Sequence, residues 1–239
     1  MITLTQMPRI GGIPNLSPPC MKLETWLRMT GIAYEIGPFD TSRAPKGKLP
    51  YFEVEGGLAS DATLALDFLR ARHRVDPDAH LSPGDAAVAL AFRRLLKEHF
   101  YWVLVYTRWH ADESYADYFP IIGQVLPPSA PAPARRHVLD GLRSSLLDQL
   151  RQQGMGRHTP EEVHRLGIAD LAAVSEVLGD KPYFCGADPA TVDATIYAAV
   201  SNLIDVPVDS PVRDFALGRA NLVAHARRMA ERYFPELGD

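Results

Sequence analysis

The sequence predicts an α/β N-terminal domain over residues 1–76, followed by an all-α C-terminal domain over residues 84–239. Three observations support this fold class. Short β-branched runs alternate with helical patterns in the first third of the chain. Most later segments repeat their apolar residues at steps of three and four. The stretch ARHRVDPDAHLSPGD between the two parts is polar and contains proline, as expected for a domain boundary.

The N-terminal elements are expected in the order β-α-β, a loop, then β-β-α. The stretches ITLTQ and IAYEI are short and β-branched, so both are predicted strands. Apolar residues at helical spacing follow Cys20, and Gly31 ends that run. The stretch LPYFEVEGGLAS predicts two strands joined by a turn at Gly56 and Gly57, and a second helix begins near Leu64.

The C-terminal part is expected to consist of amphipathic helices. The first of them is a long helix over DAAVALAFRRLLKEHFYWVLVYTRWH. The proline-rich stretch YFPIIGQVLPPSAPAPA is expected to be a loop. Thr159, Pro160 and Glu162 fit the N-cap, the first-turn proline and the capping-box acid of a later helix.

The composition excludes several classes of protein. The 239 residues are 46% hydrophobic, which is enough for a sizeable core, and the net charge of −4 offers no basic face for nucleic acid. The two cysteines, Cys20 and Cys185, form no CxxC pair, and the histidines are scattered, so no metal site is expected. No secretion signal or long apolar run is present, which favours a cytoplasmic location.

Several motifs resemble the metaxin and failed-axon-connections branch of the glutathione S-transferase superfamily. They are SPPCMKLETWLRMTGIAYE, KGKLPYFEVEGG, HFYWVLVYTRW, RHTPEEVHRLGIADLAAVSEVLGDKPYF and NLVAHARRMAERYFPEL. The resemblance spans nearly the whole chain. It implies the glutathione transferase fold, with a thioredoxin-like, glutathione-binding N-terminal domain. It also implies that Asp193, in PATVDATIYAA, has a structural role at a helix start.

Ser17 is the catalytic residue that the resemblance implies. Glutathione transferases place a hydrogen-bond donor at the start of the first helix to stabilise the glutathione thiolate. In SPPC, Ser17 occupies the position of the first cysteine of a glutaredoxin-like motif, and a serine cannot form a mixed disulfide. Cys20 occupies the second-cysteine position and is expected to be buried and structural. The plain structural alternative for Ser17 is an N-cap residue.

Leu49 and Pro50 are expected to bind the glutathione backbone. The resemblance implies a cis proline before the third strand, with the backbone of Leu49 pairing with the cysteinyl part of the tripeptide. Lys48 is expected to bind the glycyl carboxylate, whereas Lys46 is expected to be solvated. The structural alternative for Pro50 is a proline that starts an edge strand.

Asp61 and Ala62 are expected to bind the γ-glutamyl end. The resemblance implies an acid followed by a serine at the next helix start, where backbone N–H groups favour a carboxylate. Asp61 matches the acid. Ala62 replaces the serine, so it keeps the backbone N–H and loses a hydroxyl. Ser60 and Thr63 flank this position and could compensate, or could simply cap the helix.

Two functions remain open at this stage. The first is conjugation of glutathione, as co-substrate, to a small hydrophobic electrophile in a homodimeric enzyme. Tyr101, Tyr106 and Trp109 could line the electrophile pocket, or they could belong to the core. The alternative is a non-catalytic binding or scaffold protein that retains the fold, as in other members of this branch. Redox chemistry through Cys20 is a third and weaker hypothesis.

Overall fold

The computed structural model describes residues 2–10, 12–54, 57–60 and 63–238. Its N-terminal part contains a sheet in the strand order β2-β1-β3-β4, in which β2 is parallel to β1 and the other pairs are antiparallel. The elements of this part are β1 (Ile2–Thr5), α1 (Pro18–Thr30), β2 (Tyr34–Ile36), β3 (Tyr51–Val54), β4 (Gly57–Ser60) and α2 (Leu64–His73). This order confirms the predicted N-terminal architecture.

The strand register brings three separate segments to one edge of the sheet. Tyr51, at the start of β3, pairs with Thr5 at the end of β1 and with Ser60 at the end of β4. The end of β1, the start of β3 and the end of β4 therefore lie at the same edge of the sheet. The predicted turn residue Gly57 pairs with Val54 and belongs to β4, so that part of the turn prediction is wrong. Gly56 lies outside the described residues.

Helix α1 begins and ends where the sequence predicts. Ser17 occupies the N-cap position, and two prolines follow it with backbone angles already suited to a helix start. Gly31 ends the helix with a φ of 67°, in the left-handed region that glycine enters without steric cost. One face packs Leu23 and Leu27 against the sheet, and both side chains are 0% exposed.

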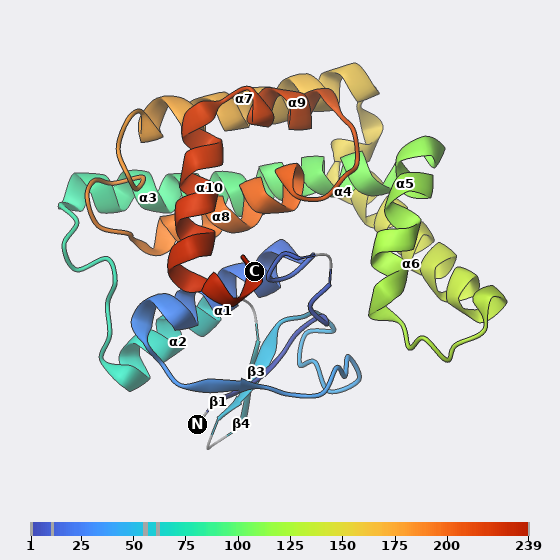
Figure 1. Ribbon diagram of the computed structural model, residues 1–239, viewed down its shortest axis with the longest axis horizontal. Coiled ribbons are helices and arrows are strands. Elements are labelled where there is room, and N and C mark those ends of the chain that lie inside the picture. The colour runs from blue at the N-terminus through green and yellow to red at the C-terminus, as the bar shows by residue number, and fades with distance from the viewer. Residues whose placement is uncertain (1, 11, 55–56, 61–62, 239) are drawn as a thin grey trace.

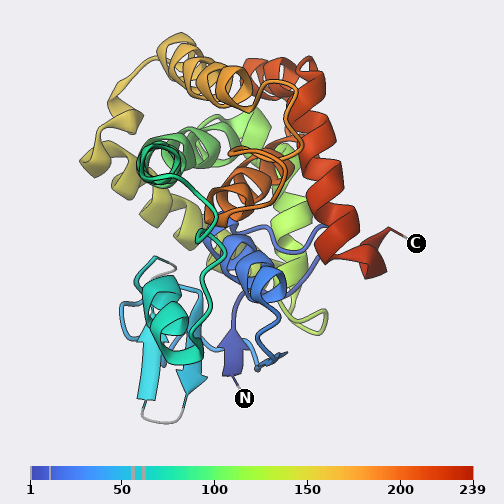
Figure 2. The same ribbon diagram turned by 90° about the vertical axis from the view of Figure 1, so that its left-hand side faces the viewer.

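Most of the remaining helices lie on the other side of α1, whereas α5 and α6 project to the right in Figure 1 (Figures 1 and 2). Figure 2 shows α1 between the sheet and α8, and α1 packs directly on α8. Trp26 Nε1 reaches across this contact and donates to Thr191 Oγ1 at 3.2 Å. The helices of this part are α3 (Pro83–Arg94), α4 (Tyr101–Trp109), α5 (Asp112–Ile122), α6 (Ala132–Gln153), α7 (Pro160–Leu178), α8 (Thr191–Ile204), α9 (Pro211–Leu217) and α10 (Ala220–Tyr233).

The long first helix of this part forms as predicted, with one irregular turn. A π-helical segment, η1 (Leu95–Phe100), joins α3 to α4. Short 3₁₀ segments also occur at η2 (Gly123–Val125), η3 (Met155–Arg157) and η4 (Pro235–Leu237). The capping box of α7 is confirmed. Thr159 Oγ1 accepts from the Glu162 N–H at 3.3 Å, and Glu162 Oε2 accepts from the Thr159 N–H at 3.0 Å.

The proline-rich loop is shorter than predicted. Helix α5 includes Pro120, although this residue lacks the N–H that would donate to the carbonyl four residues earlier. Burial of Tyr115 and Tyr118 offsets that loss. Both rings contact Trp109, with centroids at 5.7 and 5.2 Å. Helix α9 was not predicted, although Ser210 followed by Pro211 is a helix-start signal: Ser210 Oγ accepts from the Arg213 N–H at 3.2 Å.

Asp193 has the structural role that the resemblance implies. Its carboxylate is 0% exposed and accepts from the Ala190 N–H and the Phe184 N–H, each at 2.8 Å. His225 Nε2 lies 2.9 Å from the same carboxylate. Asp193 therefore ties the start of α8 to α10 and to the segment that precedes α8.

Candidate functional site

The Ser17 side chain lies at the start of α1 but does not cap that helix. Its backbone is extended, with φ −99° and ψ 111°, and its hydroxyl makes no capping hydrogen bond. The hydroxyl hydrogen-bonds instead with the Cys20 thiol, one turn into the helix. Ser17 is half-buried. The hydroxyl thus lies beside the Cys20 thiol at the helix N-terminus, and the plain capping interpretation is wrong.

The two prolines make the Ser17 hydroxyl more important at this helix start. Pro18 and Pro19 have no backbone N–H, so the first turn offers fewer donors than an ordinary helix N-terminus. The Met21 N–H already donates to the Ser17 carbonyl at 2.9 Å. An anion bound here would therefore depend on the Ser17 hydroxyl, the Cys20 N–H and the positive end of the helix dipole.

Two asparagines fix the backbone of the segment that carries Ser17. Asn15 Oδ1 accepts from the Ser17 N–H at 3.0 Å, and Asn15 Nδ2 donates to the Met7 carbonyl at 2.8 Å. From α8, Asn202 Nδ2 donates to the Asn15 carbonyl at 3.0 Å. Asn15 and Asn202 are both 0% exposed, so these hydrogen bonds are shielded from water.

Arg108 of α4 makes the second connection to the same segment. Its Nη1 donates to the Leu16 carbonyl at 3.0 Å, and its Nη2 donates to both the backbone carbonyl and the side-chain oxygen of Asn202. The guanidinium is nearly buried and lies 5.1 Å from the centre of the Tyr118 ring. Burial lowers the pKa of Arg108, and Tyr118 and Tyr101 counteract part of that effect.

Sequence reasoning did not identify this anchoring group. The available signal was a single arginine inside the otherwise apolar run YWVLVYTRW, because a charged residue on a buried helix face needs specific acceptors. The C-terminal turn of α8 supplies one such acceptor, where helix carbonyls lack partners and the dipole is negative. Arg108 is therefore satisfied structurally, and it holds the residue that directly precedes Ser17.

Leu49 and Pro50 directly precede β3 and lie at the same edge of the sheet as the end of β1. The Leu49–Pro50 peptide bond is cis, as the resemblance implies. Pro50 is buried, Leu49 is half-buried, and Lys48 and Lys46 are exposed. The pairing of Tyr51 with Thr5 brings these residues next to the end of β1, from which the chain runs to Ser17.

The predicted γ-glutamyl positions, Asp61 and Ala62, lie outside the described residues. Their described neighbours occupy the expected place. Ser60 ends β4 opposite Tyr51, and Thr63 is the N-cap residue of α2. Both neighbours are half-buried. Three segments therefore meet at one edge of the sheet. They are the end of β1, from which the chain runs to Ser17, the residues before Tyr51, and Ser60.

Cys20 has the properties of a structural cysteine. It is 0% exposed, and burial raises the pKa of its thiol to about 11. Hydrogen bonds from the Ser17 side chain and the Met7 backbone offset only part of that rise. Because the thiolate is the reactive form, Cys20 is poorly suited to thiol–disulfide exchange at neutral pH.

The three aromatic candidates for an electrophile pocket differ in their surroundings. Trp109 is 5% exposed and packs between tyrosine rings, so it belongs to the core. Tyr106 is 3% exposed and stacks on His110 at 4.0 Å, and its hydroxyl has no partner among the described residues. Tyr101 is half-buried, and Cys20 and Arg108 are both near enough to influence the pKa of its phenol, which burial raises. Tyr101 is therefore the least buried of the three, and it lies near Cys20.

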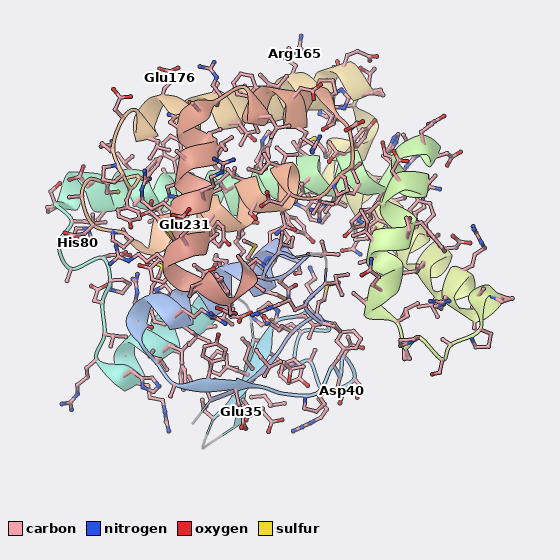
Figure 3. All side chains as sticks on the ribbon, in the orientation of Figure 1. Glu35, Asp40, His80, Arg165, Glu176 and Glu231 are labelled. Atoms are coloured by element: carbon pink, nitrogen blue, oxygen red, sulfur yellow. The ribbon has the colours of Figure 1, made fainter. Side chains whose placement is uncertain are left out.

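Two cavities in the described structure lie away from these residues. The first, of about 690 Å³, lies beside β2, in the region that Glu35 and Asp40 mark in Figure 3. The second, of about 520 Å³, lies beside α10 and is lined by Glu231, also labelled there. Neither is lined by Ser17, Leu49 or Pro50.

The described residues offer neither a metal site nor a membrane-spanning segment. No group of three or more potential ligands (His, Cys, Asp or Glu) gathers anywhere in the described ranges. Within the same ranges, no helix combines the length with the hydropathy that crossing a bilayer requires.

Two family models match the chain. The glutathione S-transferase N-terminal domain matches residues 18–114, and the glutathione S-transferase C-terminal domain matches residues 167–229. Among solved structures, the β-etherase LigF from Sphingobium sp. strain SYK-6 has a TM-score of 0.62 at 15% identity, covering 99% of this chain and 98% of that one. A glutathione S-transferase from Methylobacterium radiotolerans, in complex with glutathione sulfonate, has a TM-score of 0.59 at 18% identity and covers 100% and 93%. These likenesses show the fold.

Curated relatives confirm the resemblance that the motifs indicated. Isoprene-epoxide–glutathione S-transferase from Rhodococcus sp. (strain AD45) is 33% identical over 98% of this chain and 99% of its own length. Failed axon connections from Drosophila melanogaster is 30% identical over 99% of this chain, which spans 59% of that protein. Human Metaxin-1 is 26% identical over 94% of this chain, which spans 49% of that protein.

Proposed function

Because the chain belongs to the glutathione S-transferase family, we propose that it conjugates the thiolate of glutathione to a small hydrophobic electrophile, with Ser17 donating a hydrogen bond to the thiolate. The observation that carries this proposal is the position of the Ser17 hydroxyl. It lies at the start of α1, it does not cap the helix, and the loop around it is fixed by Asn15 and Arg108.

The remaining contacts would come from the edge of the sheet next to Ser17. The backbone of Leu49, beside Pro50, would pair with the cysteinyl part of glutathione as an added strand. Lys48 is exposed and would meet the glycyl carboxylate. Asp61 would meet the γ-glutamyl ammonium, and the N–H of Ala62 would meet its carboxylate.

Ser17 would act by stabilising charge rather than by forming a bond. A hydroxyl donor and the positive end of α1 both favour the ionised form of the glutathione thiol, so they raise the fraction of thiolate at neutral pH. The isoprene-epoxide relative makes an epoxide the electrophile to test first. Attack of the thiolate on an epoxide carbon forms the C–S bond and opens the ring, and the resulting alkoxide takes a proton from water.

The test combines calorimetric titration with a conjugation assay. We expect glutathione to bind the purified protein at millimolar concentration or below, and Ser17→Ala to lower kcat/KM about 100-fold or more, as losing one anion-stabilising donor typically does. Ser17→Thr keeps a hydroxyl and should retain part of the activity, and Ser129→Ala is the matched control on a loop outside the site. An absence of glutathione binding would overturn the proposal, whereas full activity of Ser17→Ala would overturn the role of Ser17.

A binding or scaffold role is the second candidate function. It is favoured by the position of the two cavities, neither of which contains Ser17, Leu49 or Pro50. The relatives named Failed axon connections and Metaxin-1 also bear no transferase name. This role predicts a stable complex with another protein that is indifferent to glutathione and to Ser17→Ala. Affinity capture with both protein forms, with and without glutathione, separates the two candidates.

We also propose a homodimer, in which the N-terminal part of one chain packs against the helical part of the other. Sedimentation equilibrium tests this arrangement directly, since the monomer mass is 26.4 kDa. A single monomeric species at micromolar concentration would argue against it.

A further inference from the structure

The cavity beside β2 is lined on one side by apolar residues and on the other by charged ones. Met7, Ile36 and Phe39 form the apolar wall, and the side chains of Ile36 and Phe39 are 53% and 46% exposed. Arg9 and Arg28 contribute the charged wall. The volume of about 690 Å³ lies within the usual range for small-molecule sites.

A buried carboxylate fixes the charged wall in place. Glu24 of α1 is 0% exposed, and its Oε1 accepts from Arg9 Nη2 at 2.8 Å and from Arg28 Nη2 at 3.2 Å. Tyr34 Oη donates to the same oxygen at 2.9 Å. The other oxygen accepts from Gln6 Nε2 at 2.6 Å, which leaves Gln6 Oε1 buried without a donor among the described residues. The two guanidinium groups are thus preorganised next to the cavity.

A second carboxylate, which is not among the residues that line the cavity, also contacts both arginines. Glu236 Oε1 lies 2.8 Å from Arg28 Nη2 and 3.2 Å from Arg9 Nη1. Unlike Glu24, its side chain is 44% exposed, and it belongs to the short turn η4 near the chain end. The hydrogen bond from Arg28 lowers the pKa of Glu236, so the ionised form occupies this position.

The charge balance around the two arginines explains how the Glu236 carboxylate could leave its place between them. Glu24 and Glu236 together neutralise Arg9 and Arg28. The Glu24 side chain is 0% exposed, whereas that of Glu236 is 44% exposed. If Glu236 moves outward, the wall of the cavity keeps one net positive charge and two guanidinium groups shaped for a planar carboxylate.

We propose that this cavity is a binding site for a small aromatic carboxylate, with the carboxylate replacing that of Glu236 between Arg9 and Arg28. The aromatic ring packs against the apolar wall formed by Met7, Ile36 and Phe39. Glu236 is then an internal competitor that the ligand displaces. The site lies beside β2, on the opposite side of β1 from Pro50, so it is separate from the proposed glutathione contacts and does not depend on them.

Benzoate and its neutral isostere benzamide test the site in the full-length protein. By calorimetry or ligand-observed NMR, we expect millimolar binding of benzoate and at least ten-fold weaker binding of benzamide. Glu236→Gln should tighten benzoate about two- to five-fold, because it removes a competing exposed ion pair. Glu231→Gln, an exposed glutamate on the neighbouring helix α10, is the matched control and should change nothing.

Arg9→Gln should weaken benzoate, while Arg9→Lys should restore part of the affinity. Arg9 is the safer arginine to change, since Arg28 also holds the carbonyl of Tyr233 at 2.7 Å. Ser17→Ala should leave benzoate binding unchanged, and glutathione should not compete with it. Equal binding of benzamide, no response to Glu236→Gln, or competition by glutathione would each overturn the assignment, as would an absence of benzoate binding to both wild type and Glu236→Gln.

Discussion

Arg108 donates a hydrogen bond to the carbonyl of Leu16 across 92 positions of sequence, at a distance of 3.0 Å. Leu16 directly precedes Ser17, so a residue of the helical part fixes the backbone beside the proposed thiolate donor. The same guanidinium bonds to Asn202, whose amide in turn bonds to the Asn15 carbonyl. The position of Ser17 therefore depends on α4 and α8 as well as on α1.

Arg108→Gln should destabilise the segment around Ser17 more than the rest of the protein. The substitution leaves buried carbonyl groups without donors, which typically costs about 1–3 kcal/mol per group. We expect a lower free energy of unfolding in urea, together with faster amide hydrogen exchange in residues 12–21. Arg108→Lys keeps the charge and should recover part of the protection.

The exposed Arg151 on α6 provides the control for that experiment. Arg151→Gln should change neither the stability nor the exchange. If amide exchange in the Arg108→Gln variant were accelerated equally in all parts of the protein, the change would reflect global destabilisation and would contradict a local role.

The two cysteines should react slowly and unequally with thiol reagents. Burial raises the pKa of both thiols to about 11, so roughly one thiol in a thousand is ionised at pH 8. Cys20 is 0% exposed and Cys185 is partly exposed, so Cys185 should be labelled first by Ellman's reagent. The labelling rate of Cys185 should rise about ten-fold per pH unit below its pKa.

Single variants assign the two labelling phases. Cys185→Ser should remove the faster phase, and Cys20→Ser should remove the phase that requires opening of the structure. If Cys20 is labelled first at pH 8, its structural role is wrong, and the redox hypothesis for this residue gains support.

Gly167 marks a close approach of helices α4, α7 and α9. A Cβ atom at this position would lie 2.6 Å from Val103 Cγ1 and 3.2 Å from Val212 Cγ1. Both neighbours are β-branched and have few alternative rotamers. Gly167→Ala should therefore destabilise the protein by about 1–3 kcal/mol, measured by urea unfolding.

Gly141 is the matched control within α6. It is exposed, and a Cβ atom there would meet no heavy atom within 4 Å. Gly141→Ala should stabilise the protein by about 0.5–1 kcal/mol, because alanine restricts the unfolded chain and favours the helix. A stabilising Gly167→Ala would show that the three helices can separate without cost.

The features predicted correctly from sequence depend on residues that are close together in the chain. Ser17, Pro18 and Gly31 delimit α1 through local backbone preferences, and the capping box at Thr159 involves residues three positions apart. The turn beside Gly57 was placed one residue too late, because a pair of glycines does not itself fix the strand register.

The anchoring of Ser17 could not be predicted in the same way. Helical spacing indicates which residues share a face of α4, but it does not identify the carbonyl that Arg108 meets 92 positions away. Pro120 illustrates the same limit. Its local preference argues against a helix, and the packing of Tyr115 and Tyr118 on Trp109 outweighs that preference.

The contact between His99 and Asp170 should make stability depend on pH in a specific direction. His99 Nδ1 lies 2.6 Å from Asp170 Oδ2 and joins η1 to α7. Burial raises the pKa of Asp170, and His99 counteracts part of that rise. His99→Ala should therefore raise the pKa of this carboxyl further and leave a buried carboxylate without its hydrogen-bonding neighbour.

A carboxyl whose pKa is higher in the folded than in the unfolded protein favours folding while it is protonated. That contribution is lost as the pH rises through the folded-state pKa. His99→Ala should then lower the free energy of unfolding by about 1–2 kcal/mol at pH 7.5. This value is reduced for solvent screening, because the His99 side chain is 37% exposed. The loss should become smaller toward pH 4, where the Asp170 carboxyl takes up a proton. Urea unfolding at both pH values measures it. In an Asp170→Asn background, His99→Ala should cost little at either pH, and an unchanged cost there would show that the histidine acts through other contacts.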